Sequence, residues 1–529
     1  MNQYQPATLL VGQSGGATAV INASLAGIVA AAQATGSWPR ILGLAHGIEG
    51  LFTRRFHDLS DISAEQLQLL ANTPSAALGT GRYKLKDDDL ARVVHTMHGL
   101  GVTAFAYIGG NDSADTAHRI GSFARNIGYD LQVMSVPKTI DNDLPDTDFC
   151  PGYPSIARYL GTATRDAVYD TVASPQIYPV KFMEVMGRDA GWVAAACTAG
   201  LSADEQDMAP LLMLPERAPA NRQAVLEAIE KDIDRRGYSV VVVPETMRAA
   251  DGSHFGGDEP EYVDPFGHPY YASTGAALTR LVQTELGLRA RYEKPGTSAR
   301  MSISLASSVD LEMAWKLGAE AIHAIQRGES GKMTALKRVP DGFEIVLVPQ
   351  TNIANRVRHL DDDFIGADGM SVTPAFHSYL QPLLGEHPFP TYMRLPDPVA
   401  FSGSEPATPS VSPVQIPADQ EATADLDLAV GDGEDGYGID AHGDRFVIKI
   451  GQDVIGSCGN KIGEVVDVRD DYLVVEKGFF NPEDIYVPKD TIRSFDEHHL
   501  KLNVSRDASS HAGWEDDPDA SGDDQTPVM

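Results

Sequence analysis

Four side chains suited to proton transfer beside a phosphate lie in one short segment, PKTIDND, at residues 137–143. Lys138 and Thr139 precede two carboxylates, Asp141 and Asp143. Acids two residues apart next to an ammonium suit a site that removes a proton from a hydroxyl while it handles phosphate charge. A solvated Asx-turn is the alternative interpretation, because turns favour the same acids. The segment therefore predicts either a catalytic loop or a surface turn.

Two glycine-rich loops add groups that can bind an anion. They are GQSGG at residues 12–16 and IGGNDS at residues 108–113. The backbone N–H groups of such loops, together with a helix N-terminus, can cradle a phosphate. In the second loop Asn111 and Asp112 place an amide and a carboxylate where a metal-bound anion would lie. Two simpler interpretations stay open, namely glycines required sterically by the turns and a helix N-cap formed by Asp112 or Ser113.

Two further segments carry residues suited to a sugar phosphate. Met186-Gly187-Arg188 ends the run KFMEV, and Glu245 follows the uncharged run VVVVP. An arginine can fork onto a phosphate, and a glutamate can accept hydrogen bonds from sugar hydroxyls. Either residue alone would equally suit a surface ion pair, so the prediction rests on their occurrence together.

The elements that must position these residues follow one repeating pattern up to about residue 350. A short β-branched run, a glycine-rich break and a segment of helical periodicity recur, which predicts an α/β fold with doubly wound parallel sheets. Ligands in such folds bind at the carboxyl ends of the strands, where the segments above fall. The predicted strands are Thr8–Val11, Thr103–Ile108, Leu131–Val136, Val180–Met186 and Tyr238–Val243, and the clearest helices are Thr18–Ala34 and Ala114–Asn126.

Composition divides the rest of the chain. Residues 401–444 hold ten acids and no lysine or arginine, which is typical of a flexible linker. Short strand-like runs between glycines then predict a small all-β barrel over residues 445–507. The acidic residues 508–529 are expected to be a disordered tail. We therefore expect a catalytic domain at 1–400, a linker at 401–444, a β domain at 445–507 and a tail at 508–529.

Charge and cysteine usage exclude several function classes. The 42 lysines and arginines against 74 acids give a net charge of −32, which opposes binding to nucleic acid or to an anionic membrane. The three cysteines, Cys150, Cys197 and Cys458, show neither disulfide nor zinc-ligand spacing. No signal peptide or membrane span is evident, so a cytoplasmic protein is expected.

Taken together, these segments resemble the phosphofructokinase family. The motifs SGG, IGGNDS, PKTIDND, MEVMGR, VVVPE and RYEKPGTSAR occur in the family's order over roughly residues 7–395. The resemblance implies two α/β lobes and transfer of a phosphoryl group to fructose 6-phosphate. It also implies an oligomer, expected here as a homodimer or homotetramer, because some arginines of the family reach a neighbouring subunit.

The resemblance assigns roles residue by residue. Asp141 matches the general base that takes the proton of the sugar 1-hydroxyl. Gly16 and Arg82 match groups beside the phosphoryl donor. Arg300, and with it Arg291, match arginines that reach the 6-phosphate. The remaining matches are the substrate loop and the sugar-phosphate contacts, namely Thr139, Ile140, Asp143, Met186, Gly187, Arg188 and Glu245.

Two positions predict the phosphoryl donor. ATP-dependent members have glycine where this chain has Asp112 and Lys138. The aspartate would place bulk and negative charge against the α-phosphate of a nucleotide, and the lysine supplies a cation for a small, highly charged anion. Both features resemble the pyrophosphate-dependent enzymes, whose reaction is reversible. An ATP-dependent enzyme and a non-catalytic regulatory paralogue are the alternatives.

The chain departs from the family at two positions. Asn111 stands where an acid associated with Mg²⁺ is usual, so Mg²⁺ dependence is expected while direct ligation by Asn111 stays open. Thr297 stands where many members have histidine or tyrosine beside the sugar phosphate. The β domain resembles PRC-barrel modules, for which no chemistry is expected.

Overall fold

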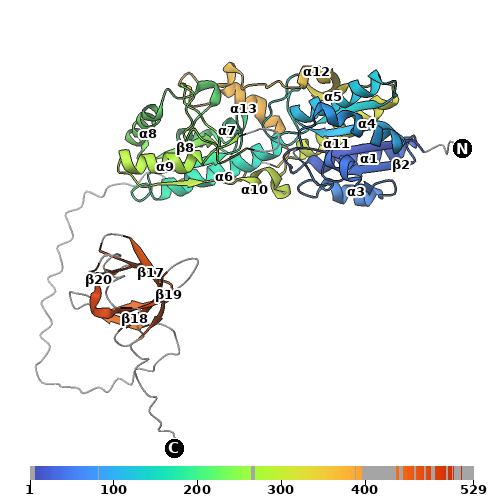
Figure 1. Cartoon of the computed structure of the whole chain (residues 1–529). Helices are drawn as coiled ribbons and strands as arrows, with labels where there is room; N and C mark the ends of the chain where they lie inside the picture. Colours follow the sequence, from blue (N-terminus) through green and yellow to red (C-terminus); the bar gives the residue numbers. More distant parts are fainter. Residues whose placement is uncertain are drawn as a thin grey trace, which may run out of the picture. The chain divides into compact units, whose positions relative to one another are not determined.

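The computed structural model describes residues 6–81, 83–263, 269–387, 389–395, 436–439, 445–457, 460–469, 472–477, 483–495, 499–502, 504 and 514. The chain divides into two compact units, Met1–Asp397 and Pro398–Met529 (Figure 1). In the described part of the chain, no helix has the length and apolar character needed to span a membrane.

The first lobe of the first unit is built on a seven-stranded sheet in the order β13-β12-β5-β4-β1-β2-β3. Its strands are β1 (Thr8–Gln13), β2 (Arg40–Leu44), β3 (Phe56–Asp58), β4 (Val102–Gly109), β5 (Gln132–Pro137), β12 (Lys332–Val339) and β13 (Gly342–Pro349). The pairs joining β2, β1, β4, β5 and β12 are parallel, whereas the edge strands β3 and β13 are antiparallel to their neighbours. The expected parallel sheet is therefore present with an antiparallel strand at each edge.

Helices cover both faces of this sheet, which explains why its strands lack polar alternation. Leu9 and Val11 of β1 pack with α1 (Ile21–Thr35) and α11 (Ser308–Gln326), while Leu10 packs with α4 (Asp87–Gly99) and α5 (Asn111–Asn126). Helices α1 and α11 approach closely, because a Cβ on Gly27 would lie 2.1 Å from the carbonyl oxygen of Trp315. This layered packing fixes the loops that leave β1, β4 and β5.

The second lobe has a four-stranded parallel sheet in the order β11-β6-β8-β7. Its strands are β6 (Val180–Val185), β7 (Leu211–Leu212), β8 (Ser239–Pro244) and β11 (Ala290–Glu293), and its main helices are α6 (Tyr153–Ala173), α7 (Trp192–Ala196), α8 (Arg222–Arg236) and α9 (Thr274–Glu285). Every residue of β6 and β8 is buried. The two sheets lie side by side in the unit (Figure 1).

Short elements complete the first unit. They are α2 (Glu49–Thr53), α3 (Ala64–Ala71), β9 (Tyr262–Val263), β10 (Pro269–Tyr270), α10 (Thr297–Met301), α12 (Gln350–Ile353), α13 (Pro374–Leu380) and the 3₁₀ turns Ala203–Met208, Pro215–Arg217, Ile303–Leu305, Asp362–Phe364 and Gln381–Leu383. The predicted strands are confirmed to within two residues. The helix predicted from Thr18 begins at Ile21, and the one predicted from Ala114 begins at Asn111.

The second unit is all-β in its described residues, as expected. A six-stranded sheet in the order β19-β18-β17-β16-β21-β20 encloses an aliphatic core, and β14 pairs antiparallel with β15. The strands are β14 (Gly436–Ile439), β15 (Arg445–Ile448), β16 (Asp453–Ile455), β17 (Lys461–Val468), β18 (Tyr472–Lys477), β19 (Glu483–Pro488), β20 (Ile492–Phe495) and β21 (His499–Leu502), with a 3₁₀ turn at Lys489–Thr491.

Two details of the second unit differ from the expected boundaries. Gly436–Ile439 of the predicted linker forms β14, because its backbone pairs with β15. Trp514 of the predicted tail is buried in the β core, and its carbonyl accepts a hydrogen bond of 2.7 Å from the N–H of Tyr486. Burial of a large aromatic side chain offsets the cost of ordering this residue. The rest of the predicted linker and tail lies outside the described residues.

A chain that ends after Ser402 is expected to fold as the first unit does in the full protein, because the cores of the two lobes lie within residues 1–397. Differential scanning calorimetry of both chains checks this expectation. The truncated chain should be soluble and keep the main transition within a few degrees. Aggregation, or a strongly lowered transition, would show that the first unit depends on the second.

Candidate active site

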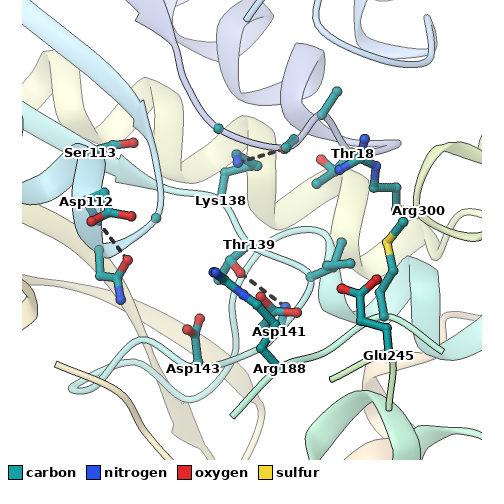
Figure 2. A pocket seen from close by; sticks show the side chains of 17 residues that line it. Thr18, Asp112, Ser113, Lys138, Thr139, Asp141, Asp143, Arg188, Glu245 and Arg300 are labelled. Carbon is teal, nitrogen blue, oxygen red and sulfur yellow. Dashed lines mark hydrogen bonds between the residues drawn. The ribbon is translucent and has the colours of Figure 1, made fainter. Parts of the chain in front are cut away.

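One pocket collects the loops at the carboxyl ends of strands from both lobes (Figure 2). The loops after β1, β4 and β5 supply one wall. The loops after β6 and β8, together with α10, supply the other. This is where ligands bind in doubly wound folds. The predicted site residues that line the pocket are Gly16, Asn111, Asp112, Lys138, Thr139, Ile140, Asp141, Asp143, Met186, Arg188, Glu245 and Arg300.

Two cations lie directly on the first glycine loop. The buried Lys138 donates from Nζ to the carbonyl oxygen of Gly16 over 2.8 Å. A Cβ on Gly16 would lie 2.5 Å from Nη1 of Arg300, and one on Gly15 would lie 3.3 Å from the Lys138 ammonium. Gly15 also has a positive φ of 76°. Glycine is therefore required here for close approach of the cations as well as for the turn.

The second glycine loop places an acid at the start of α5. The N-cap of this helix is Gly110, with no side-chain capping hydrogen bond, so the predicted alternative of a cap by Asp112 or Ser113 is wrong. Instead the Asn111 side-chain oxygen accepts a hydrogen bond of 2.8 Å from the backbone N–H of Asp112. Asp112 is thereby held at the edge of the pocket (Figure 2).

The loop after β5 aims both of its carboxylates at the pocket (Figure 2). Its start is tied to the neighbouring strand by a hydrogen bond of 3.0 Å from the N–H of Lys138 to the carbonyl of Gly109. The Thr139 hydroxyl then accepts a bond of 3.1 Å from the N–H of Asp141. The turn formed by residues 139–141 lines the pocket, so the segment is not a surface turn.

Burial makes the acids of the pocket hard to ionise. It raises the pKa of Asp141, while the nearby charges of Arg188 and Lys138 oppose that rise. Burial, and then repulsion from Asp141, raises the pKa of Asp143 to about 7. The same two causes raise the pKa of Glu245 to about 7. A group poised near neutral pH can accept a proton and release it again.

The second-lobe residues enter the pocket from two buried strands. Gly187 has a φ of 109°, which carries the chain from β6 to Arg188, but Gly187 itself does not line the pocket. Glu245 is fixed through its backbone: its N–H donates to the carbonyl of Val185 over 2.9 Å, and its carbonyl accepts from the Thr274 hydroxyl over 3.0 Å. An arginine and a glutamate thus face the acid pair from the other lobe.

Arg291, which the sequence places in the site, points elsewhere. It lies exposed on the edge strand β11, with Cζ 3.4 Å from the ring centroid of Tyr178, and it does not line the pocket. A cation stacked on an aromatic face is a stable alternative to an anion contact. Arg82 lies outside the described residues.

Five further residues line the pocket: Gly15, Gly110 and Ser113 belong to the two predicted glycine-rich loops, whereas Ala17 and Thr18 were missed by sequence reasoning. Thr18 is the most informative, because its buried hydroxyl has no hydrogen-bond partner in the described residues. The signal was available, since Thr18 lies two residues after the last glycine of the loop and precedes α1. No cluster of three or more His, Cys, Asp or Glu side chains is arranged for a metal ion within the described ranges.

Comparison with known proteins defines the class. The phosphofructokinase family model matches residues 8–325, which is more than half of the chain. The chain belongs to the phosphofructokinase family, and it is a phosphotransferase.

Two named relatives and one solved structure are similar to the chain over more than 70% of its length. The chain is 38% identical to the pyrophosphate–fructose 6-phosphate 1-phosphotransferase of Xanthomonas campestris over 391 residues, which are 72% of this chain and 92% of the relative. It is 35% identical to the enzyme of that name from Methylococcus capsulatus over 400 residues, covering 73% and 93%. The solved pyrophosphate-dependent phosphofructokinase of Nitrosospira multiformis matches with a TM-score of 0.66 and 32% identity, covering 74% of this chain and 95% of that one.

Proposed function

We propose that this protein transfers a phosphoryl group from pyrophosphate to the 1-hydroxyl of fructose 6-phosphate, giving fructose 1,6-bisphosphate and phosphate, and that it runs in both directions in glycolysis and gluconeogenesis. The carrying observation is that Asp112 and the buried Lys138, which donates to the Gly16 carbonyl, line the same pocket as Asp141. The relatives named above support the same donor.

In this proposal the chain's own residues position the reactants and move one proton. Asp141 accepts the proton of the 1-hydroxyl as that oxygen attacks the phosphorus. Arg188 and Lys138 favour the ionised form of Asp141 against the effect of its burial, and they attract the phosphate oxygens, whose charge shifts in the transition state. Glu245 accepts from the sugar hydroxyls, and Arg300 contacts the sugar phosphate. Holding both reactants in one geometry supplies most of the rate enhancement.

The donor is selected at the start of α5. The carboxylate of Asp112 lies where the α-phosphate of a nucleotide would bind. Like charges repel strongly in a partly desolvated pocket, so a nucleotide is disfavoured. Pyrophosphate has no further phosphate to place there. Lys138, anchored on Gly16, offers a fixed charge to its compact anion.

The donor set at this end of the pocket fits Mg²⁺, which is commonly held by one or two carboxylates, waters and substrate phosphates. Asp112 and Asn111 would hold the ion. Asp112 is the stronger of the two ligands because its carboxylate is charged, and the Asn111 side-chain oxygen, which accepts from the N–H of Asp112, keeps one lone pair for the ion. When bound, the ion would neutralise charge on the transferred phosphoryl group.

Arg291 is the basis for an oligomer in this proposal. Its guanidinium lies exposed on the edge strand β11 and stacks on Tyr178, outside the pocket of its own chain. A homodimer or homotetramer would allow it to reach the sugar phosphate of a neighbouring copy. A cytoplasmic location is consistent with the two buried free thiols, Cys150 and Cys197.

The pH dependence of the reaction should reflect Asp143 and Glu245, whose pKa values are raised to about 7. Their carboxylates are protonated as pH falls through about 7, so kcat/KM should fall on the acid side near that pH. Glu245→Gln removes a negative charge that repels Asp141, and it should shift this limb to lower pH. The exposed Glu312→Gln is the control and should leave the limb unchanged. Because all three proteins share the ionisations of the substrate, an unchanged limb in Glu245→Gln would contradict the coupling.

The reaction itself is tested with the purified protein, pyrophosphate, fructose 6-phosphate and Mg²⁺, followed by ³¹P NMR. The expected result is loss of pyrophosphate matched by orthophosphate and a new phosphate monoester, and the reverse when the products are supplied. Absence of turnover in both directions would favour the non-catalytic paralogue.

A further inference from the structure

A segment beyond the residues matched by the family model lies against the back of the catalytic loop. The family model ends at residue 325, whereas the strap, defined here as residues 353–360, and α13 both come later in the chain. The strap contacts both lobes: the N–H of Arg358 donates to the carbonyl of Asp143 over 2.7 Å, and the Trp192 indole donates to the carbonyl of Arg358 over 3.2 Å. The strap therefore links the loop that carries the acid pair to α7.

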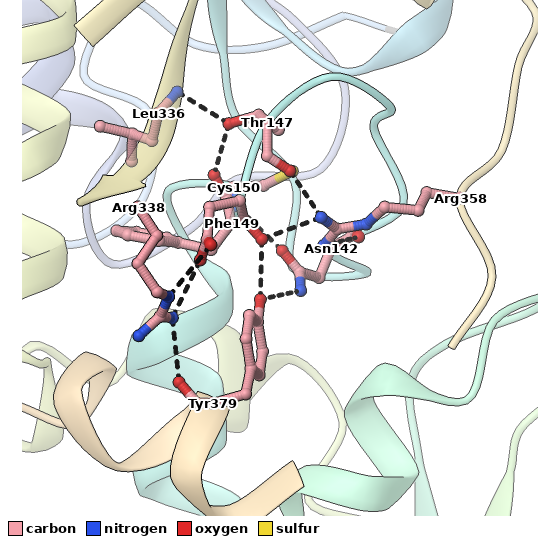
Figure 3. A network of polar contacts seen from close by, with 9 residues as sticks. Asn142, Thr147, Phe149, Cys150, Leu336, Arg338, Arg358 and Tyr379 are labelled. Atoms are coloured by element: carbon pink, nitrogen blue, oxygen red, sulfur yellow. Dashed lines mark hydrogen bonds and ion pairs between the residues drawn. The ribbon is translucent and has the colours of Figure 1, made fainter. Parts of the chain in front are cut away.

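Asn142 anchors the loop after β5, called here the catalytic loop (residues 138–150), through its side-chain contacts (Figure 3). It stands between Asp141 and Asp143, is fully buried and has a φ of 56°. Its amide donates to the Tyr379 hydroxyl over 2.9 Å, and its side-chain oxygen accepts from the N–H of Cys150 over 2.9 Å. The conformation that directs both carboxylates into the pocket thus depends on contacts made on the opposite side of the loop.

Arg358 gathers three main-chain carbonyls of the same loop (Figure 3). Its Nη2 donates to Asn142 over 2.9 Å, and its Nη1 donates to Thr147 over 2.5 Å and to Asp148 over 2.9 Å. Its guanidinium also lies over the Trp192 ring, with Cζ 4.5 Å from the centroid. A planar fork with several donors can span separated carbonyls in this way, whereas the compact ammonium of lysine cannot.

Tyr379 and Arg338 complete the network (Figure 3). The Tyr379 hydroxyl donates to the carbonyl of Asp148 over 2.8 Å while it accepts from Asn142. Arg338 forms two bonds with the Asp148 carboxylate, of 3.1 and 2.9 Å, and another of 3.0 Å to the Tyr379 carbonyl. The loop at 142–150 is therefore fixed by side chains from β12, the strap and α13.

We propose that Arg358 is a positioning residue of the reaction, which sets the catalytic loop against α7 and so fixes Asp141 and Asp143 relative to the substrates, with Tyr379 supporting it from behind. Arg358 does not line the pocket in which the reactants are proposed to bind. It acts through the backbone of the loop. The kinetic part of this inference rests on the proposed function.

The test compares Arg358→Lys with the wild type in two measurements. Hydrogen exchange of the amides at 138–150, measured without substrate, should become at least tenfold faster because three carbonyl contacts are lost. The kcat should fall about a hundredfold, with the KM for both substrates changed far less, because small displacements of a reacting group mainly penalise the transition state. The exchange measurement needs no turnover, so it tests the positioning role even if the donor assignment fails.

Arg217→Lys is the matched control, because Arg217 is exposed and forms an ion pair of 2.8 Å with the exposed Asp362. It should change neither measurement. Tyr379→Phe keeps the ring and removes the hydroxyl, so a three- to tenfold fall in kcat is expected for that milder change. Unchanged exchange at 138–150 in folded Arg358→Lys, or a kcat within threefold of the wild type, would overturn the inference. If Arg358→Lys does not fold, Tyr379→Phe decides by the same two measurements.

Discussion

Asp141→Asn should lower turnover by about 10²- to 10⁴-fold, because the amide keeps the shape of the side chain but cannot accept the proton. The N–H of Asp141 would still donate to the Thr139 hydroxyl, so the turn at this position is expected to persist. Removing a buried acid whose pKa is raised removes an unfavourable ionisation at neutral pH. The variant should therefore be at least as stable as the wild type near pH 7.

A control for this variant lies in the same loop. Asp146 is exposed, has a φ of 58° and accepts from the Asn352 amide over 2.9 Å. Asparagine tolerates that backbone conformation, so Asp146→Asn should keep near-normal rates. Steady-state rates of the three proteins at saturating substrate make the comparison. Near-normal turnover by Asp141→Asn would show that another group takes the proton.

Replacing the donor-side pair should change which phosphoryl donor the enzyme uses. Asp112→Gly removes bulk and charge that would meet an α-phosphate, so kcat/KM with ATP should rise. Lys138→Gly removes the cation anchored on Gly16, so it should chiefly damage the use of pyrophosphate. Only the double variant has glycine at both positions, and the two effects should be non-additive because both groups address one ligand.

The effects of charge and of bulk at residue 112 can be distinguished with Asp112→Asn, which keeps the side-chain volume and removes the charge. Glycine is a poor helix former, roughly 1 kcal/mol less favourable than alanine in a helix interior, so all variants are compared at a temperature well below unfolding. We would measure kcat/KM for both donors in the wild type, the single variants and the double variant. A donor preference indifferent to Asp112 would remove the physical basis for the pyrophosphate assignment.

The strand ends of the site were predictable because buried parallel strands leave a plain signal. The runs before Lys138 and Glu245 lack polar alternation, and both residues follow their strands as expected. The direction of an exposed side chain is a different matter. Arg291 was placed in the site by its motif, but in the structure its guanidinium stacks on Tyr178. No local sequence pattern distinguishes a side chain that points into the pocket from one that stacks on a neighbouring ring.

Contacts between distant segments could not be predicted from local patterns either. Arg358 and Asn142 are 216 residues apart, and neither belongs to a motif that names the other. Trp514 lies in an acidic segment whose composition predicts disorder, yet its single indole is buried in the β core. A prediction from composition averages over many residues, so it does not detect a single large side chain that packs into a core.

The identity of the phosphoryl donor is tested most directly by kcat/KM of the wild type for pyrophosphate and for ATP, at matched concentrations of fructose 6-phosphate and Mg²⁺. The proposed pyrophosphate dependence predicts efficient turnover with pyrophosphate and little or none with ATP, because Asp112 and Lys138 favour a compact anion over a nucleotide. A kcat/KM for ATP equal to or above that for pyrophosphate would contradict it and assign the chain to the ATP-dependent phosphofructokinases.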